Sequence, residues 1–379
     1  MKIGILTLPL HNNYGGLLQN YALQVALRNL GHAPLTIRID YKDSNFFKVL
    51  FWTGYRLLLR IYGKKIRVLD VIPSKSQKEI ISQHTSRFIE NNIKMTKRIK
   101  QKVNQDLLVE HKFDAYIVGS DQVWRPKYSP QQSTYFLDFL EGTTSVKKIT
   151  YAASFGVSEW DFNEKDTKEY GRLLKMFDAV SVREDSAVNL CRTYFNLDSA
   201  HLLDPTLLLD KEVYTRIVEK QKIKKSPGNL FSYILDKSAV KSAVVDAVAT
   251  KLGLSPFSVM ARRSFAEFGK RSLDDCVFPP VEEWIRGFMD ARFVITDSFH
   301  GTVFAILFNK PFLSLANKSR GLSRFTSLLK LFHLEDRLVF SFDDLELNNL
   351  KEIQWESVNS ILKDEKEKSF QFLKMNLTR

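Results

Sequence analysis

The chain has 379 residues, more than one compact core usually holds, so we expect two domains of ordinary size. Apolar residues make up 44% and charged residues 26%, values typical of a globular protein, and no apolar run is long enough to predict a transmembrane helix. The formal charge of +13 favours anionic partners, but the chain has no zinc-finger spacing, RNP-like strand or basic repeat, so nucleic acid is not expected.

The opening segment, MKIGILTLPL, has a strand pattern and no small-residue cleavage site, so it is not expected to be a signal peptide. Cys191 and Cys276 lie far apart without a CxxC motif, which predicts neither a zinc site nor a disulfide framework. We therefore expect a cytoplasmic protein.

Short apolar strands alternate with helical patterns, which predicts an α/β fold with mostly parallel sheets and helices on both faces. The strands expected in the first half are Lys2–Leu8, Leu35–Asp40, Asp114–Gly119, Lys147–Ala153 and Ala179–Arg183. Those expected in the second half are Asn229–Leu235, Phe257–Ala261, Arg292–Thr296 and Pro311–Leu315.

The alternation pauses at LLDPTLLLDKEVY, where Pro205 follows Asp204. We therefore expect two Rossmann-like domains, residues 1–208 and 209–379, facing each other across a cleft. A helical pattern from Leu350 to Leu377 could cross back over the first domain.

The first polar turn, Asn13 to Gly16, follows the opening strand. Its glycines could allow a substrate to come close, although a tight turn is the simpler explanation, and no GxGxxG fingerprint is present. The amide of Asn13 is the most promising contact for a substrate. Asn13, Tyr14 and Gly15 are the candidate residues here for binding an acceptor substrate.

Two later strands also end in polar residues, at the sheet edge where ligands bind in open α/β folds. Asp121 could act as an acid or base and Gln122 could bond a sugar. Trp124 could stack on a sugar face or equally belong to the core. Arg183 offers a planar fork for carboxylate or phosphate, with a surface salt bridge to Glu184 or Asp185 as the alternative.

The most informative stretch is FVITDSFHGTVFAILFNKPFLSL, which predicts a strand, a polar turn, a helix and a second strand. The turn holds Asp297, Ser298, His300, Gly301 and Thr302. A helix start offers free N–H groups and a positive dipole end to an anion, and Gly301 would let the backbone approach it. The alternative is an ordinary connection with Asp or Ser as the N-cap. Further on, Arg320 and Arg324 could hold an anion or be solvated.

Together these segments resemble the polysaccharide pyruvyl transferase family. The resemblance rests, in chain order, on LTLPLHNNYGGLLQNYALQVALRNLGH, YIVGSDQVWRP, ITYAASFG, AVSVRED, LLDPTLLL and the stretch around His300. It implies a GT-B-like arrangement and transfer of a pyruvyl group from phosphoenolpyruvate to a sugar, as a ketal. The acceptor would be a precursor of a surface polysaccharide such as a capsule or exopolysaccharide, and would bind on the side of the N-terminal domain. The chemistry needs no metal or redox cofactor.

By the same resemblance, His300 matches the catalytic histidine and Arg183 an arginine that binds phosphoenolpyruvate. Some members have an arginine two residues before the histidine, where this chain has Ser298, so Arg320 or a lysine would supply that charge. We therefore expect His300, Asp121 and Asp297 to be catalytic, and the donor to be bound by Arg183, Ser298, Gly301, Thr302 and Arg320. A GT-B glycosyltransferase that uses a nucleotide sugar and a non-catalytic glycan-binding protein are the alternatives.

The segment from Phe46 to Val68 interleaves large apolar residues with basic ones. Trp52 and Tyr55 suit the headgroup region of a membrane, and the basic residues suit anionic lipid. The alternatives are a helix packed on the core with snorkelling arginines, or a protein contact. Peripheral association with the inner face of a membrane would suit a lipid-linked acceptor.

Overall fold

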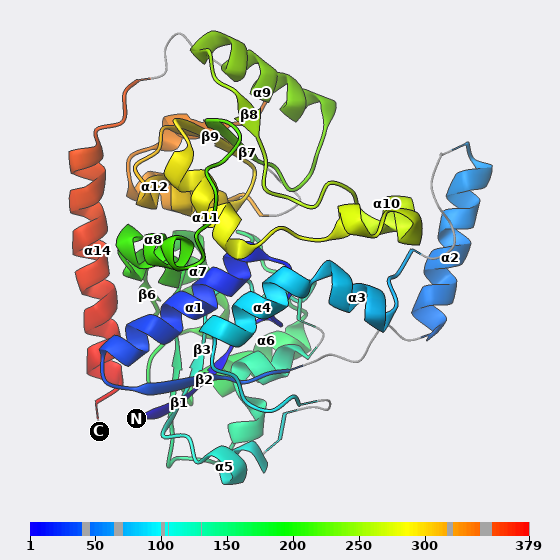
Figure 1. The fold of residues 1–379 in the computed structure, drawn as a ribbon. Coiled ribbons are helices and arrows are strands. Elements are labelled where there is room, and N and C mark those ends of the chain that lie inside the picture. The colour runs from blue at the N-terminus through cyan, green and yellow to red at the C-terminus, as the bar shows by residue number, and fades with distance from the viewer. Residues whose placement is uncertain are drawn as a thin grey trace.

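The computed structural model describes residues 1–39, 46–63, 71–99, 103–104, 106–129, 131–316, 321–341 and 351–378. Figure 1 shows two α/β halves stacked on each other, with the C-terminal helix running along both. This agrees with the predicted fold class of two Rossmann-like units.

The first half is built on a parallel sheet of four strands in the order β2-β1-β3-β4. These are β1 (Lys2–Leu6), β2 (Ala33–Thr36), β3 (Ala115–Val118) and β4 (Lys147–Thr150). The short pair β5 (Ser181–Val182) and β6 (Ala200–His201) extends the sheet through bridges from Ile149 to Ala179 and from Ala153 to Val182. The helices are α1 (Tyr14–Asn29), α2 (Phe46–Ile61), α3 (Lys75–Ile81), α4 (Gln83–Asn92), α5 (Asp106–His111), α6 (Glu164–Leu174) and α7 (Asp185–Phe195).

The second half has a parallel sheet of five strands in the order β11-β10-β9-β7-β8. These are β7 (Leu230–Tyr233), β8 (Pro256–Phe257), β9 (Phe293–Thr296), β10 (Phe312–Leu315) and β11 (Leu338–Val339). The helices are α8 (Lys211–Lys220), α9 (Ala239–Leu252), α10 (Phe265–Phe268), α11 (Val281–Asp290), α12 (Phe299–Leu307), α13 (Ser323–Leu331) and α14 (Trp355–Asn376).

Each predicted strand overlaps an observed one, and the strands that the sequence missed, β6 and β11, have only two residues each. All four residues of β3 and of β9 are buried, as expected for inner strands of a parallel sheet with both faces covered. Helix α12 is buried over its whole length, which explains why its sequence is apolar all round.

Tyr14 joins the two halves at the start of α1. Its hydroxyl donates a 2.8 Å hydrogen bond to the carbonyl of Pro279, and its ring lies 5.8 Å from that of Trp284. Both rings are fully buried, so the halves share part of one apolar core. Tyr14 is therefore held in the interior, away from solvent.

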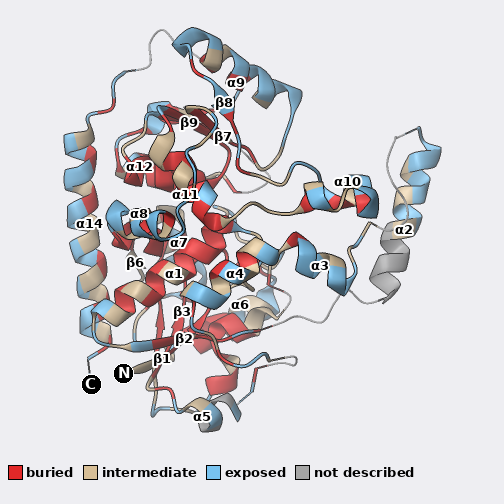
Figure 2. Cartoon of the chain, viewed as in Figure 1, coloured by how far each residue is buried: buried red, intermediate tan, exposed pale blue. Residues whose placement is uncertain are grey.

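Helix α14 packs back on the first half, where the Ser369 hydroxyl accepts a hydrogen bond from the backbone N–H of Leu203 at 3.3 Å. In Figure 2 its buried side faces the protein and its other side is exposed. The two sheets lie on either side of residue 208, the predicted domain boundary, although the boundary itself stays a prediction. Within the described residues, no helix is long and apolar enough to cross a membrane.

Candidate active site

A small pocket of about 60 Å³ lies between the two halves. It forms where the carboxyl ends of β3 and β9 meet the starts of α1 and α12, the position at which open α/β sheets bind ligands. Its walls come from both halves: Asn13, Asp121, Gln122, Tyr128, Leu235, Asp297, Ser298, Phe299, His300, Arg324 and Phe325.

His300 sits in the first turn of α12, next to the helix start that the sequence predicted. Ser298 caps this helix, its hydroxyl accepting a hydrogen bond from the N–H of Gly301 at 3.4 Å. A Cβ at Gly301 would lie 2.1 Å from Oγ1 of Thr296, so the glycine allows α12 to pack on β9. Thr302 hydrogen-bonds Ser314 at 2.6 Å inside the second half and does not line the pocket.

Asp204 lies beside His300 and Arg183, although its segment, LLDPTLLL, served in the sequence prediction only as a linker and as part of the family resemblance. Its Oδ2 lies 2.7 Å from Nη1 of Arg183 and 3.5 Å from Nε2 of His300. Ser120 donates to the same oxygen at 3.1 Å, and the N–H and hydroxyl of Thr206 donate to Oδ1 at 3.0 and 2.7 Å. The carboxylate thus ties the His300 ring of one half to the strand ends of the other.

Burial by itself would raise the pKa of Asp204, but His300 and Arg183 outweigh it and hold the pKa well below its usual range. Asp204 is therefore ionised at neutral pH and supplies a fixed negative charge to the imidazole. The available sequence signal was its place in LLDPT, where the alternation of strands and helices pauses.

Two buried arginines flank the ring of Phe299. The guanidinium carbon of Arg183 lies 4.6 Å from the ring centroid and that of Arg324 lies 5.4 Å from it. Arg324 lines the pocket, whereas Arg183 lies behind it, bonded to Asp204. Among the described residues, Nε and Nη2 of Arg183 have no hydrogen-bond partner.

The pKa of Arg324 is lowered to about 10 by burial and by the neighbouring charge of Arg183. It stays protonated at neutral pH, so two like charges share one buried region. Nearby carboxylates offset these charges: Asp204 and Asp121 lie 2.7 and 3.9 Å from Arg183, and Glu184 acts on both arginines. An anion in the pocket would relieve this repulsion.

Asp297 also borders the pocket, but its carboxylate is bonded within the second half. It accepts hydrogen bonds from the backbone N–H groups of Leu235 and Asp236 at 2.6 and 3.1 Å. Lys241 donates to it at 2.6 Å. This geometry ties the loop after β7 to the end of β9 and leaves little carboxylate surface for a substrate.

The structure places some of the residues expected to bind the acceptor at the pocket and others in the core. Asn13 is exposed at the rim, and Gln122 lines the pocket with its carbonyl oxygen 3.0 Å from Nη1 of Arg125. Trp124 is fully buried and stacks on Phe136 at 5.4 Å, which places it in the core, the alternative that the sequence left open. Arg320 lies outside the described residues.

The start of α1 touches the imidazole directly. A Cβ on Gly15 would lie 2.1 Å from Nδ1 of His300, so no larger residue fits without a shift. Gly15 therefore has a role in packing against the candidate catalytic ring, which its sequence context alone did not indicate.

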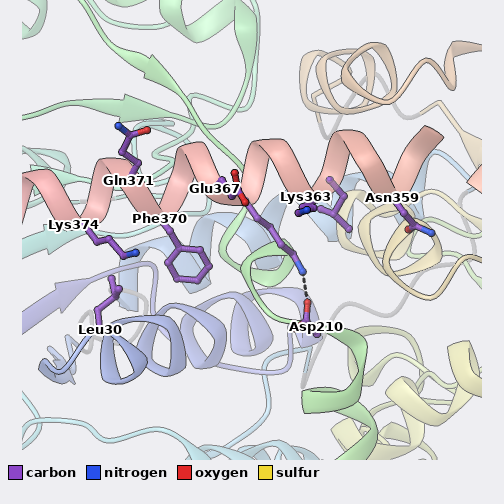
Figure 3. A pocket seen from close by; sticks show the side chains of 10 residues that line it. Leu30, Asp210, Asn359, Lys363, Glu367, Phe370, Gln371 and Lys374 are labelled. Carbon is purple, nitrogen blue, oxygen red and sulfur yellow. Dashed lines mark hydrogen bonds and ion pairs between the residues drawn. The ribbon is translucent and has the colours of Figure 1, made fainter. Parts of the chain in front are cut away.

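A larger groove of about 840 Å³ runs beside α14 (Figure 3). Its walls carry lysines and apolar side chains, and Lys366 is paired with Asp210 at 2.6 Å. It is far more open but lacks the buried charged groups of the smaller pocket, so we take the smaller one as the site. Within the described part of the chain, no group of three or more His, Cys, Asp or Glu side chains could hold a metal ion.

Comparison with known families identifies the family of this chain. Residues 13–319 match the family described as polysaccharide pyruvyl transferase. The chain belongs to the polysaccharide pyruvyl transferase family. It is therefore a transferase, and the matched range includes the starts of both α1 and α12. The comparison with curated proteins gave no match.

Solved structures agree on the fold. The UDP-GlcNAc 2-epimerase from Neisseria meningitidis has a TM-score of 0.53 at 10% identity, covering 100% of this chain and 99% of its own. MnaA from S. aureus, solved with UDP, has a TM-score of 0.52 at 11% identity, covering 99% and 96%. At these identities the likeness shows the two-domain GT-B-like fold alone.

The contact between Gly15 and His300 gives a first prediction. Gly15→Ala should displace the imidazole or α1, with a cost of about 1–3 kcal/mol for overpacking and a loss of most transferase activity. Gly54→Ala on α2 is the matched control, because its added Cβ would meet no atom within 4 Å and lies away from the pocket. Thermal unfolding and phosphate release are measured for both variants. Normal activity in Gly15→Ala would contradict the packing role.

Asp204 gives a prediction on stability against pH. Its folded pKa lies below the unfolded value of about 3.9, so its contribution is fully present above the unfolded value and is lost progressively as pH falls from there toward the folded pKa. Asp204→Asn should lower the free energy of unfolding by about 3–5 kcal/mol at pH 7, because the buried Arg183 would lose its closest counter-charge. The difference from wild type should shrink below about pH 4.

Urea unfolding at pH 7 and at acidic pH measures this difference. Asp198→Asn is the control, since its pair with Arg192 is exposed and should contribute about 0–1 kcal/mol. An equally large difference for Asp204→Asn at both pH values would show that the carboxylate charge is not what stabilises the fold.

Proposed function

We propose that this transferase moves the pyruvyl group of phosphoenolpyruvate onto a sugar of a surface-polysaccharide precursor, as a ketal. The observation that carries the proposal is the grouping of His300 and Arg324 in one pocket between the halves, with the buried Arg183 behind it against the ring of Phe299. Phosphoenolpyruvate carries a carboxylate and a phosphate, so it needs two cationic or N–H-rich contacts in close proximity.

Some family members have a donor-binding arginine where this chain has Ser298. Arg324 is our candidate for supplying that positive charge instead. It lines the same pocket as Ser298 and His300, and its pKa is lowered by burial and by the nearby charge of Arg183. Arg183 supports it from behind Phe299, with two guanidinium nitrogens unbonded among the described residues. The helix start at Ser298 would add a favourable dipole for the same anion.

The reaction needs one proton on carbon 3 of the enol and two new bonds at carbon 2. Protonation gives an oxocarbenium-like carbon 2, two sugar hydroxyls add to it, and the bond to phosphate oxygen breaks. The two hydroxyl groups lose two protons in total. One replaces the proton given to carbon 3, and the other leaves on the phosphate. No redox step occurs, so the proposal includes no redox cofactor and no metal.

His300 is the proposed acid and base for these proton transfers, because imidazole can both give and take a proton near neutral pH. Asp204 would orient the ring from one side, while Gly15 leaves room for it on the other. Asp121 lines the same pocket and is a second candidate for accepting a hydroxyl proton.

The acceptor would approach from the side of Asn13 and Gln122, on the first half. A nucleotide-sugar glycosyltransferase is the second candidate, because the structural relatives named above are a UDP-GlcNAc epimerase and a protein solved with UDP. Release of inorganic phosphate from phosphoenolpyruvate separates the two functions from release of a nucleotide. Release of neither would favour the non-catalytic glycan-binding alternative.

Removal of the imidazole should remove most of the activity. His300→Ala should reduce phosphate release by about 10²–10⁴-fold, the usual contribution of one acid–base group, with a normal circular dichroism spectrum. His84→Ala on α4, away from the pocket, is the control and should keep wild-type activity. A folded His300→Ala enzyme with near-normal turnover would exclude this role.

The arginine pair gives a prediction on donor affinity. Arg324→Lys keeps the charge but loses the planar fork, so the KM for phosphoenolpyruvate should rise about tenfold, equivalent to about 1.4 kcal/mol. Arg183→Lys should weaken donor binding as well, and the KM for the sugar should change less in both variants. Arg172→Lys, on the surface beside Glu141 and Glu169, is the control. An unchanged specificity constant for the donor would assign the pair a structural role.

A further inference from the structure

Exposed apolar side chains are concentrated at one corner of the molecule. Of the thirteen large hydrophobic residues that are exposed in the described part of the chain, eight lie on α2, at α3 or on α10. They include Ile61 and Tyr62, exposed to 71% and 83% at the end of α2. The full set is Tyr55, Leu57, Leu58, Ile61, Tyr62, Ile72, Ile80 and Phe268, which we call the apolar corner.

Both halves of the protein contribute to this corner. Figure 1 shows α2, α3 and α10 on the same side of the molecule, with α2 outermost. The backbone N–H of Phe278 donates to the carbonyl of Ile81 at 3.0 Å, and Ile81 packs with Phe265 and Cys276 in a small core of their own. These contacts join α3 of the first half to α10 and the residues that follow it in the second half.

The same corner is basic. Its exposed residues include three acidic side chains, Glu79, Glu267 and Asp274, against seven basic ones: Arg60, Lys75, Lys78, Arg262, Arg263, Lys270 and Arg271. The guanidinium of Arg263 lies 4.6 Å from the ring of Phe268, so charge and apolar surface are in direct contact. The described part of α2 carries no acidic residue. In sequence, Lys64, Lys65 and Arg67 follow α2, although they lie outside the described residues.

We propose that the apolar corner docks the enzyme on an anionic membrane surface. Aliphatic and aromatic side chains would enter the boundary between headgroups and acyl chains, while the basic side chains meet anionic headgroups. A second copy of the chain fits less well, because a symmetric interface would face one basic surface with another. Nucleic acid would complement the charge but leaves Leu57, Leu58 and Ile61 without apolar contacts.

This inference goes beyond pyruvyl transfer and does not depend on it, since vesicle binding is measured without substrate. Docking would hold the pocket near a lipid-linked sugar. The segment Phe46–Val68, in which the sequence indicated membrane contact, supplies only part of the surface, and the side chains of residues 46–52 lie outside the description. The rest comes from α3 and α10.

The test is co-sedimentation of the full-length protein with phosphatidylcholine vesicles, with or without phosphatidylglycerol. The protein should sediment with the anionic vesicles, and much less with neutral ones or at high salt, because salt screens the headgroup charge. Changing Arg60, Lys270 and Arg271 to glutamine should lower the apparent vesicle affinity at least about tenfold. The same change at Lys220, Lys224 and Lys225 removes equal charge elsewhere and should have a much smaller effect.

A second set separates the apolar contribution. Leu57→Ser, Leu58→Ser and Ile61→Ser together should abolish retention, while Val240→Ser, Leu252→Ser and Met375→Ser, at exposed positions elsewhere, should not. Circular dichroism and analytical ultracentrifugation accompany each variant. Wild-type protein that never sediments with anionic vesicles would overturn the proposal. So would equal losses in the test and control sets, or a stable dimer that the serine variants dissociate.

Discussion

The candidate site depends on one buried carboxylate, Asp204, that serves two cationic or hydrogen-bonding partners at once. It fixes Arg183 on the first half and faces His300 on the second, at 2.7 and 3.5 Å. A buried charge of this kind is stable only while its partners stay in place. The same carboxylate thus links the two halves and lies beside the imidazole, so stability and, in our proposal, catalysis depend on one group.

Charge in this region is arranged in layers. Asp204 and Arg183 form the inner layer, and Phe299 separates Arg183 from the pocket that Arg324 lines. Nη1 of Arg183 is bonded to Asp204 and this side chain does not line the pocket, so an arriving anion would interact mainly with Arg324 and the start of α12. This arrangement gives affinity for an anion at a defined place, and a membrane-facing corner elsewhere would not disturb it.

The sequence predicted the fold well, because strands such as Phe293–Thr296 are continuous apolar runs bounded by polar turns. It also predicted that Asp121, Ser298 and His300 would meet at strand ends. It could not predict that Arg183 would be covered by Phe299, or that Asp297 would be bonded to Lys241, because such contacts join segments distant in the chain. Asp204 escaped notice for a related reason, since a two-residue strand such as β6 leaves little periodicity to read.

The central claim is that the pocket beside His300 takes phosphoenolpyruvate as the donor. Titration calorimetry of wild-type protein with phosphoenolpyruvate, and separately with UDP-GlcNAc, tests it without knowledge of the acceptor. We predict saturable binding of phosphoenolpyruvate that Arg324→Lys weakens and that UDP-GlcNAc does not compete away. Binding of UDP-GlcNAc at the same site, with no heat from phosphoenolpyruvate, would contradict the account.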